Sequence, residues 1–574
     1  MRTNLKLTLL IVLAVVFLQW YVSSCHTQKM NTGETAVRNY YYQQTDSLLQ
    51  KLDLLATSAS AHQPTATLQL QFANSRYNYK KIEPVIEYYF QGLTKRVNGP
   101  ALPDIKTEDG QVWPPHGFQV IEQLLYSGYN DSLQANLSGE IRLLQTDLRY
   151  MRENMAYYTI SANHIREIIR HQFIRIAAWG ITGFDAPLSK LSLREAEFSL
   201  SGISTIFSQF QGKNEEDEKE KLMAAAITYL QTNSDFETFN RLVFLTGYLM
   251  PLSDHYDVIR GFDFKFDSLM IQPFQGTLSQ LLKGKGFNGD YYSSYAMAKS
   301  NPEKIALGKK LFFDNRLSKS GTVSCGSCHQ PGLFFTDGKE KAGDFVHGGS
   351  LPRNTPSLYY AALQSHQFYD LRSVTLEDQA NEVMKNSSEF NFTSSGIAKK
   401  LLADKEYFSL FEEAFGITEG GPGGYEVRNA LAAFVRSLSP FSSPFDEYMK
   451  GNRSALSGEQ VQGFNLFTGK AKCATCHFIP LFNGNIPPWF TKSESEIIGV
   501  PSKAIWQKAI IDTDSGRYKI NRMDELMFAF KTPTVRNAEK TAPYMHNGVY
   551  KTLDDVVEFY HKGGGVGIDI PLPF

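Results

Sequence analysis

Hydrophobic residues recur every three to four positions through the first half of the chain, a spacing that predicts long amphipathic helices. In one such run the apolar positions extend from Ile141 to Met151, and we expect Ser138 to cap the start of this helix. A second long run covers residues 162–179. Glycine and proline are sparse from residue 30 to about residue 285. This half of the chain is therefore expected to form a helical bundle.

Two segments in the second half of the chain share one pattern of helix starts. Each contains Gly-x-x-Leu-Phe within a predicted helix, at residues 308–312 and 463–467. We expect Asn301 to cap the first of these helices, and Ser457 and Gln460 to form a capping box at the start of the second. The helices thus begin two comparable units.

The same two units also share their turns. Each has a Thr-Pro turn, at 355–356 and 532–533, and each later has a Thr-Leu-acid-acid helix start, at 375–378 and 552–555. The distance from the proline to the second threonine is the same in both units. Shared spacing of this kind predicts two copies of one helical domain.

A Cys-x-x-Cys-His pentad stands in each unit, at 325–329 and 473–477. Two thiols three residues apart on a helical turn can both reach the vinyl groups of one porphyrin, and the next histidine can bind its iron. A redox dithiol needs no following histidine, and the pairs lie too far apart for an ordinary zinc ribbon. The pentads predict two covalently bound haem c groups, held by Cys325, Cys328, His329, Cys473, Cys476 and His477.

These patterns together predict an all-α protein. An N-terminal helical bundle (25–285) is followed by a first haem domain (286–445) and a second haem domain (446–574), both of the cytochrome c type and related by a pseudo-two-fold axis. The formal net charge of −1 gives no electrostatic case for binding nucleic acid.

The N-terminus has the features of an export signal. Arg2 and Lys6 precede a short apolar run at 7–20, and the Val-Ser-Ser-Cys sequence that ends at Cys25 resembles a bacterial lipobox. We expect residues 1–24 to be a lipoprotein signal peptide and the Cys25 thiol to carry lipid. The alternative is an uncleaved anchor with a chance cysteine. Since bacteria attach haem covalently after export, we expect a periplasmic protein anchored to a membrane of a Gram-negative bacterium.

Two short patches of the bundle resemble imelysin-like periplasmic domains. That family carries Gly-x-His-x-x-Glu, to which Gly117, Gln119 and Glu122 correspond, and residues 183–187 (Gly-Phe-Asp-Ala-Pro) also resemble it. Because Gln119 replaces the histidine, a metal role is in doubt. A helical bundle that docks or spaces the haem domains is the simpler expectation, beside a sensing or iron-related module.

Residues 300–574 resemble the bacterial di-haem cytochrome c peroxidases. The matching motifs are at 334–338, 353–356, 368–372 and 376–380 in the first unit, and at 469–473, 530–537 and 541–548 in the second. The resemblance implies that the first haem is peroxidatic and that the second relays electrons. Hydrogen peroxide would be the substrate, and a monohaem cytochrome c or a cupredoxin would be the periplasmic donor. Whether the protein forms a homodimer stays an open question.

The resemblance also implies which residues act beside the first haem. Glu389 matches the distal glutamate of the family, and Gln379 matches the distal glutamine, with Arg372 in register with both. Cleavage of peroxide needs a group that takes a proton from one oxygen and returns it to the other, and Glu389 is the candidate. Tyr369 stands where the family has a tryptophan between the haems, so an aromatic relay is retained.

Further metal ligands follow from the same resemblance. One calcium ion between the haems would be held by the Asn354 side chain and the carbonyls of Thr541 and Pro543, since hard oxygen ligands suit calcium. His347 lies close to the position of a removable sixth ligand of the first haem, offset by one residue. Tyr560 stands where many members place an axial methionine of the second haem.

Tyr560 keeps a second function open. A phenolate is a hard anionic ligand that stabilises ferric iron and lowers the reduction potential. Tyrosine at this position resembles the di-haem enzyme of methylamine utilisation, which oxidises a protein substrate through high-valent iron. The alternative is a surface tyrosine beside His561. We therefore expect a peroxidase, with an oxidase of a protein or other substrate, or a non-catalytic electron carrier, as alternatives.

Overall fold

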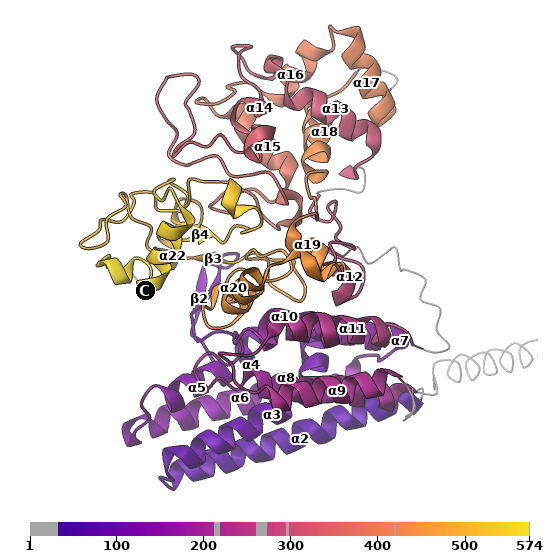
Figure 1. The fold of residues 1–574 in the computed structure, drawn as a ribbon, viewed down its shortest axis with the longest axis vertical. Coiled ribbons are helices and arrows are strands. Elements are labelled where there is room, and N and C mark those ends of the chain that lie inside the picture. Colours follow the sequence, from indigo (N-terminus) through magenta and orange to yellow (C-terminus); the bar gives the residue numbers. More distant parts are fainter. Residues whose placement is uncertain (1–31, 212–217, 260–271, 294–297, 418–420, 573–574) are drawn as a thin grey trace, which may run out of the picture.

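The computed structural model describes residues 32–211, 218–259, 272–293, 298–417 and 421–572. The expected signal peptide and Cys25 lie outside these residues. Figure 1 shows the N-terminal bundle at one end of the molecule and the first haem domain at the other, with the second haem domain between them. In the part of the chain that is described, no helix is both long and apolar enough to cross a membrane.

Long helices build the N-terminal bundle, as the hydrophobic spacing predicts. They are α2 (Thr32–Ser60), α3 (Thr65–Tyr89), α6 (Gln134–Asn154), α7 (Ala162–Arg175), α8 (Ser192–Gln211) and α9 (Glu218–Thr232). The shorter elements are α4 (Gln91–Asn98), α5 (Phe118–Tyr126), α10 (Arg241–Phe244), α11 (Met250–Tyr256) and α12 (Leu278–Leu282), with an antiparallel hairpin of β1 (Asp104–Lys106) and β2 (Gln111–Trp113).

The structure corrects the predicted start of the helix that contains Ser138 and confirms the predicted helical run at 162–179. Helix α6 begins at Gln134, a turn before Ser138, so Ser138 lies inside the helix and does not cap it. The chain enters α6 through a 3-10 turn at Asp131–Leu133, which Asn130 caps by accepting a hydrogen bond from the Ser132 amide. The predicted run at 162–179 is helical throughout, because α7 continues as a π-helix over Ile176–Gly180.

A buried network of ion pairs connects helices α3, α7 and α8 with the Gly-Phe-Asp-Ala-Pro patch. Asp185 lies at its centre and accepts hydrogen bonds from Lys80 Nζ and Arg175 Nη1, both at 2.6 Å. Burial acts to raise the pKa of Asp185, but the charges of Arg175 and Lys80 outweigh it and hold that pKa below its ordinary value. The other members are Arg76, Glu83, Glu87 and Glu195.

The patch that contains Gln119 and Glu122 is also held by hydrogen bonds inside the bundle. The Gln119 amide donates to the Asn98 carbonyl at 3.0 Å, and Glu122 accepts from the Ser189 amide at 2.8 Å. Among the described residues, no group of three or more histidine, cysteine, aspartate and glutamate side chains is placed to hold a metal ion. Both patches therefore act, in the described structure, as parts of the bundle interior.

We expect Asp185→Asn to destabilise the bundle strongly. The amide keeps the shape of the carboxylate but leaves Lys80 and Arg175 buried without their central counter-charge, a loss typically worth about 3–5 kcal/mol. Denaturant unfolding followed by far-ultraviolet circular dichroism measures it. Glu237→Gln, which removes the partner of Lys190 from a surface ion pair, is the control and should change nothing measurable. Equal stabilities of the two variants would contradict this view of the network.

The first haem domain is assembled around two crossing helices. Its helices are α13 (Pro302–Phe312), α14 (Cys325–Cys328), α15 (Leu376–Lys385), α16 (Ser394–Leu401), α17 (Lys405–Phe415) and α18 (Gly424–Arg436). Asn301 caps α13 as predicted, by accepting a hydrogen bond from the Lys304 amide at 2.7 Å. Gly308 allows α13 to approach α18, because a Cβ there would lie 1.8 Å from the Ala430 carbonyl oxygen.

The second haem domain has fewer helices and more irregular chain. It contains α19 (Pro444–Met449), α20 (Gly458–Thr468), α21 (Tyr518–Asn521) and α22 (Leu553–His561), with a short antiparallel pair of β3 (Ser495–Glu496) and β4 (Phe530–Lys531). The predicted capping box of Ser457 and Gln460 at the start of α20 is confirmed. Gly463, the counterpart of Gly308, faces open space, so the shared glycine has a packing role only in the first unit.

The bundle and the second haem domain share one hydrophobic core. Met449, Ile479 and Phe490 of the second haem domain belong to the same buried cluster as the bundle helices, whereas the first haem domain has a core of its own. Aromatic contacts cross the boundary: His171 packs against Trp489 with ring centroids 4.0 Å apart. The bundle is thus packed directly against the second haem domain.

Candidate functional site

A cavity opens beside α14 in the first haem domain. Its apolar lining includes Phe312, Phe345, Leu376, Met384, Phe390 and Leu431. Its polar lining includes Cys325, Cys328, His329, Gln379 and Glu389. An apolar cavity with a thiol pair and an imidazole on its wall has the chemistry of a haem site.

The first pentad is held in a form suited to haem attachment. Cys325 and Cys328 are free thiols on the single turn of α14, which Ser324 and Ser327 cap reciprocally. His329 Nδ1 lies 2.9 Å from the Phe335 carbonyl oxygen and donates to it as a neutral imidazole, which leaves Nε2 for a metal. Burial lowers the pKa of His329 and so favours the neutral ring. The residues present fit a covalently bound haem.

The second pentad repeats this arrangement. Cys473 and Cys476 are free thiols, and His477 Nδ1 lies 3.0 Å from the Pro533 carbonyl oxygen. An aromatic ring accompanies each histidine at nearly the same place. The ring of Phe312 lies 6.4 Å from that of His329 at 46°, and the ring of Phe467 lies 6.3 Å from that of His477 at 49°. The second site therefore also fits a haem.

The two helices that begin after a threonine, one in each unit, also have equivalent N-terminal caps. Thr375 caps α15 by accepting from the Asp378 amide, and Thr552 caps α22 by accepting from the Asp555 amide. Because these caps follow the pentads in both units, the local geometry supports the duplication that the sequence spacing predicts.

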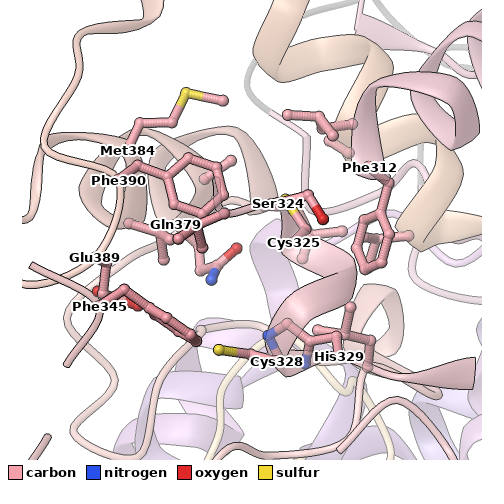
Figure 2. A pocket seen from close by; sticks show the side chains of 18 residues that line it. Phe312, Ser324, Cys325, Cys328, His329, Phe345, Gln379, Met384, Glu389 and Phe390 are labelled. Carbon is pink, nitrogen blue, oxygen red and sulfur yellow. The ribbon is translucent and has the colours of Figure 1, made fainter. Parts of the chain in front are cut away.

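Glu389 and Gln379 lie on the wall of the first cavity. Figure 2 shows Glu389 across the cavity from His329, with the Gln379 amide extending between them. Asn386 Nδ2 donates to Glu389 Oε2 at 2.6 Å and fixes the carboxyl group. Burial raises the pKa of Glu389, although the Asn386 hydrogen bond and the Arg372 charge oppose it. A carboxyl group whose pKa is raised is better able to hold and return a proton near neutral pH.

Arg372 does not line this cavity. Its guanidinium donates to Asp370 at 2.8 Å and to Glu382 at 2.7 Å, and it stacks 3.4 Å above the centre of the Phe368 ring. Its charge still acts on Glu389. The described geometry thus gives Arg372 a positioning role in this loop, and a direct catalytic role stays a prediction.

His347 also lies outside the cavity. Its side chain is 60 % exposed, and its Nδ1 lies 3.2 Å from the Asp344 carboxylate. Phe345, from the same loop, lines the cavity instead (Figure 2). The His347 ring lies 3.4 Å from the hydroxyl of Ser388, the neighbour of Glu389, but it is not on the cavity wall. Its role as a removable ligand stays a prediction.

The residues expected between the two haems do meet. The Tyr369 hydroxyl donates to Asn354 Oδ1 at 2.6 Å, and Asn354 Nδ2 donates to the Pro543 carbonyl at 3.0 Å. Thr541 precedes Pro543 by two residues, and the Asn354 amide donates to the His546 carbonyl at 2.9 Å. Tyr369 and the three expected calcium ligands thus lie together where the two haem domains join.

Tyr560 lies close enough to the second pentad to be affected by the charges of Cys476 and Cys473, and its role as an axial ligand stays a prediction. Although 47 % of the residue is exposed, burial of the phenol and the nearby charges of Cys476 and Cys473 raise its pKa to about 12. An uncharged phenol is the expected state before a metal is bound. The proximity to both thiols makes Tyr560 a candidate ligand on this side of the molecule.

Sequence reasoning missed a carboxylate at the second pentad. The charge of Glu496 raises the pKa of both Cys476 and Tyr560. Burial and repulsion from Glu494 raise the pKa of Glu496 to about 7, while Lys95 of α4 opposes the rise. No local motif marks Glu496, because its setting depends on a lysine from the distant N-terminal bundle.

Comparisons with known proteins agree with this geometry. A family model described as di-haem cytochrome c peroxidase matches residues 302–454. The chain is 39 % identical to the methylamine utilization protein MauG of Methylorubrum extorquens, over 46 % of this chain and 70 % of that protein. It is 33 % identical to the cytochrome-c peroxidase IdrP1 of a Pseudomonas species, over 47 % and 75 %, and 32 % identical to the cytochrome c551 peroxidase of Nitrosomonas europaea, over 46 % and 74 %.

Proposed function

The chain belongs to the di-haem cytochrome c peroxidase family, and from this premise we propose that it reduces hydrogen peroxide to water. The electrons come from a small periplasmic donor, a monohaem cytochrome c or a cupredoxin. One observation carries the proposal: Glu389 and Gln379 lie on the wall of the same cavity as Cys325, Cys328 and His329. A pure electron carrier needs no proton-exchanging carboxyl group in its haem cavity.

Each residue on the cavity wall has a separate role in the proposed reaction. A haem on the first pentad supplies an iron that binds peroxide and delivers electrons to it. Glu389 takes a proton from the nearer oxygen and returns it to the departing one, while Asn386 holds the carboxyl group in place. The Gln379 amide orients the peroxide, and the apolar lining excludes bulk water. Two electrons and two protons convert each hydrogen peroxide into two water molecules.

The second haem completes the electron supply. Cys473, Cys476 and His477 would hold this haem, which would supply a redox centre between the donor and the first haem. The region around Tyr369 would carry the electrons between the two haem domains. The support for this route is two hydrogen bonds that join the two haem domains there, from the Lys531 amide to the Tyr369 carbonyl and from the Asn354 side chain to the Pro543 carbonyl. Within the first haem domain, the Tyr369 hydroxyl donates to Asn354.

The proposal is tested with the purified holoprotein and a reduced monohaem cytochrome c. Oxidation of the donor should begin only when hydrogen peroxide is added, and two donor molecules should be oxidised per peroxide consumed. The absorbance of the donor reports the rate. Absence of any peroxide-dependent oxidation, with both haems bound and the donor reduced, would refute the peroxidase assignment.

We further propose one calcium ion held by Asn354, Thr541 and Pro543. The Asn354 side chain and the Pro543 carbonyl already lie within hydrogen-bond distance, and a bound ion would replace that bond by two oxygen ligands once the amide turns. Chelation of calcium should then slow electron transfer between the haems, and added calcium, but not magnesium, should restore it. No bound calcium in the purified holoprotein by elemental analysis would contradict this site.

For the location of the protein, we propose a lipid anchor at Cys25 and a periplasmic position on a membrane of a Gram-negative bacterium. The support is the basic start, the short apolar run and the lipobox-like sequence. Cys25→Ser should release the protein into the soluble periplasmic fraction or leave an unprocessed precursor, which fractionation and immunoblotting distinguish. Normal processing and membrane attachment of the variant would show that another feature anchors the chain.

A further inference from the structure

Three basic side chains lie close together where the two haem domains meet. His366 comes from the first haem domain, and Arg517 and Lys531 come from the second. Burial lowers the pKa of Arg517, and it lowers that of Lys531 to about 8. Burial also lowers the pKa of His366, and the positive charges of Arg517 and Lys531 lower it further. The His366 ring therefore lies close enough to Arg517 and Lys531 to be affected by both charges.

The protein groups around this cluster do not neutralise it. Lys531 Nζ donates to Gln364 Oε1 at 2.5 Å and Arg517 Nη1 donates to Ser495 Oγ at 3.0 Å, and both acceptors are uncharged. Arg517 Nε is buried and has no hydrogen-bond partner. Within the described ranges, none of the three basic side chains forms an ion pair with a carboxylate.

The acidic residues of the surroundings act only from a distance. Glu494 and, more weakly, Glu108 and Asp370 raise the pKa of Arg517 by their charges alone. Glu108 affects His366 in the same way. Asp370 affects Lys531 in the same way, but its carboxylate is taken by Arg353, at 2.7 Å, and by Arg372. A partly buried group of cations without a counter-ion is unfavourable, since each loses hydration and gains no pairing. The cluster therefore has the composition of a site for an anion.

The cluster lies beside the second haem site. Ser495 and Lys531 pair across the β3–β4 ladder, so their side chains share one face of this hairpin. Lys531 stands two residues before Pro533, whose carbonyl oxygen is 3.0 Å from His477 Nδ1. The Lys531 amide donates to the Tyr369 carbonyl at 2.7 Å, which directs this end of the hairpin toward the first haem domain.

We propose that His366, Arg517 and Lys531 form a carboxylate-binding site that receives the propionate groups of the second haem. A haem carries two carboxylates on the side away from its thioether bonds, and the guanidinium fork of arginine suits such a group particularly well. The three residues are positioning residues that fix the orientation of the haem, and the positive charges of Arg517 and Lys531 favour its reduced state. His366 also makes the site depend on contact between the two haem domains.

The inference rests on the proposed function only in requiring a haem on the second pentad. It is tested on the holoprotein with Lys531→Met, which removes one cation of the site, and with Lys309→Met, which removes one from the exposed face of α13. Lys531→Met should lower the midpoint potential of the second haem in a spectroelectrochemical titration and shift its propionate bending bands in resonance Raman spectra. Lys309→Met should leave both unchanged, and Lys531→Arg should restore them.

The source of the carboxylate is tested with acetate as the probe. If propionates fill the site, added acetate leaves the potential of the wild-type protein unchanged. If acetate shifts that potential and Lys531→Met removes the shift, the site takes a carboxylate from solution and the propionate assignment is overturned. Wild-type potential and Raman bands in both Lys531→Met and His366→Gln would overturn the site itself.

Haem content and peroxide turnover are measured separately in every variant. Mass on the denatured protein shows whether both haems are attached, and should Lys531→Met lose a haem, His366→Gln takes its place in the comparison. If the wild-type protein fails to turn over peroxide while the potential still responds to Lys531→Met, the proposed function fails and the carboxylate site stands. If peroxide turnover is normal and the potential does not respond, the carboxylate site alone is refuted.

Discussion

Glu389→Gln is expected to lower peroxide turnover by about 10²–10⁴, the usual contribution of a positioned general acid–base. The amide keeps the size of the side chain and its contact with Asn386, but it cannot take up and return a proton. Because the change lies on the cavity wall and not on the pentad, the absorption spectra of both haems should stay nearly the same. Steady-state peroxide consumption with a reduced donor measures the effect.

The control for this variant is Glu382→Gln. Glu382 is an exposed carboxylate on α15, close to the same loop, and it pairs with Arg372 and not with the cavity. This substitution removes the same charge and should leave turnover within a few-fold of the wild type. A Glu389→Gln protein as active as the wild type would show that Glu389 does not exchange the proton, whatever the variant at position 382 does.

Tyr560→Met should raise the reduction potential of the second haem. A tyrosine phenolate stabilises ferric iron, whereas methionine paired with histidine, as in cytochromes c, favours the reduced state. The proximity of Tyr560 to Cys473 and Cys476 motivates the expectation. Spectroelectrochemical titration measures the potential, and a higher value should come with the absorption features of histidine–methionine ligation.

Tyr544→Phe serves as the matched control for position 560. Tyr544 is a partly buried tyrosine of the same domain whose hydroxyl donates to the Ala538 carbonyl, and its loss should leave the second haem unchanged. Tyr560→Phe should lose the ligand without replacing it and give a spectrum unlike that of either the wild type or Tyr560→Met. If all these proteins share one spectrum and one potential, Tyr560 is a surface residue.

The features that sequence reasoning predicted correctly depend on short-range rules. The caps at Asn301, Thr375, Ser457 and Thr552 each rest on a hydrogen bond between residues three apart, so the sequence holds all the information they need. The pentads are local in the same sense. Ser138 was the wrong choice of cap because a 3-10 turn that begins earlier leads into α6, and weak local signals do not separate such starts.

The parts that sequence reasoning missed depend on residues brought together by the fold. Glu496 becomes a buried carboxylate only because Glu494 and the bundle residue Lys95 lie beside it. His366 lies in no motif, and the 530–537 motif that contains Lys531 gives no sign of a role for that lysine. The effect of Lys531 on His366 exists only where the haem domains meet. For Glu389 the family resemblance was required, since a glutamate after two serines carries no signal of its own.

The central claim is that two haems on one chain deliver electrons to peroxide in the cavity that Glu389 lines. The most direct measurement reduces both haems without oxygen and mixes the protein with one equivalent of hydrogen peroxide in a stopped-flow spectrometer. The account predicts rapid oxidation of both haems by that single equivalent, because one peroxide takes two electrons, and much slower oxidation in Glu389→Gln. Two haems that stay reduced, or that oxidise equally fast in both proteins, would contradict it.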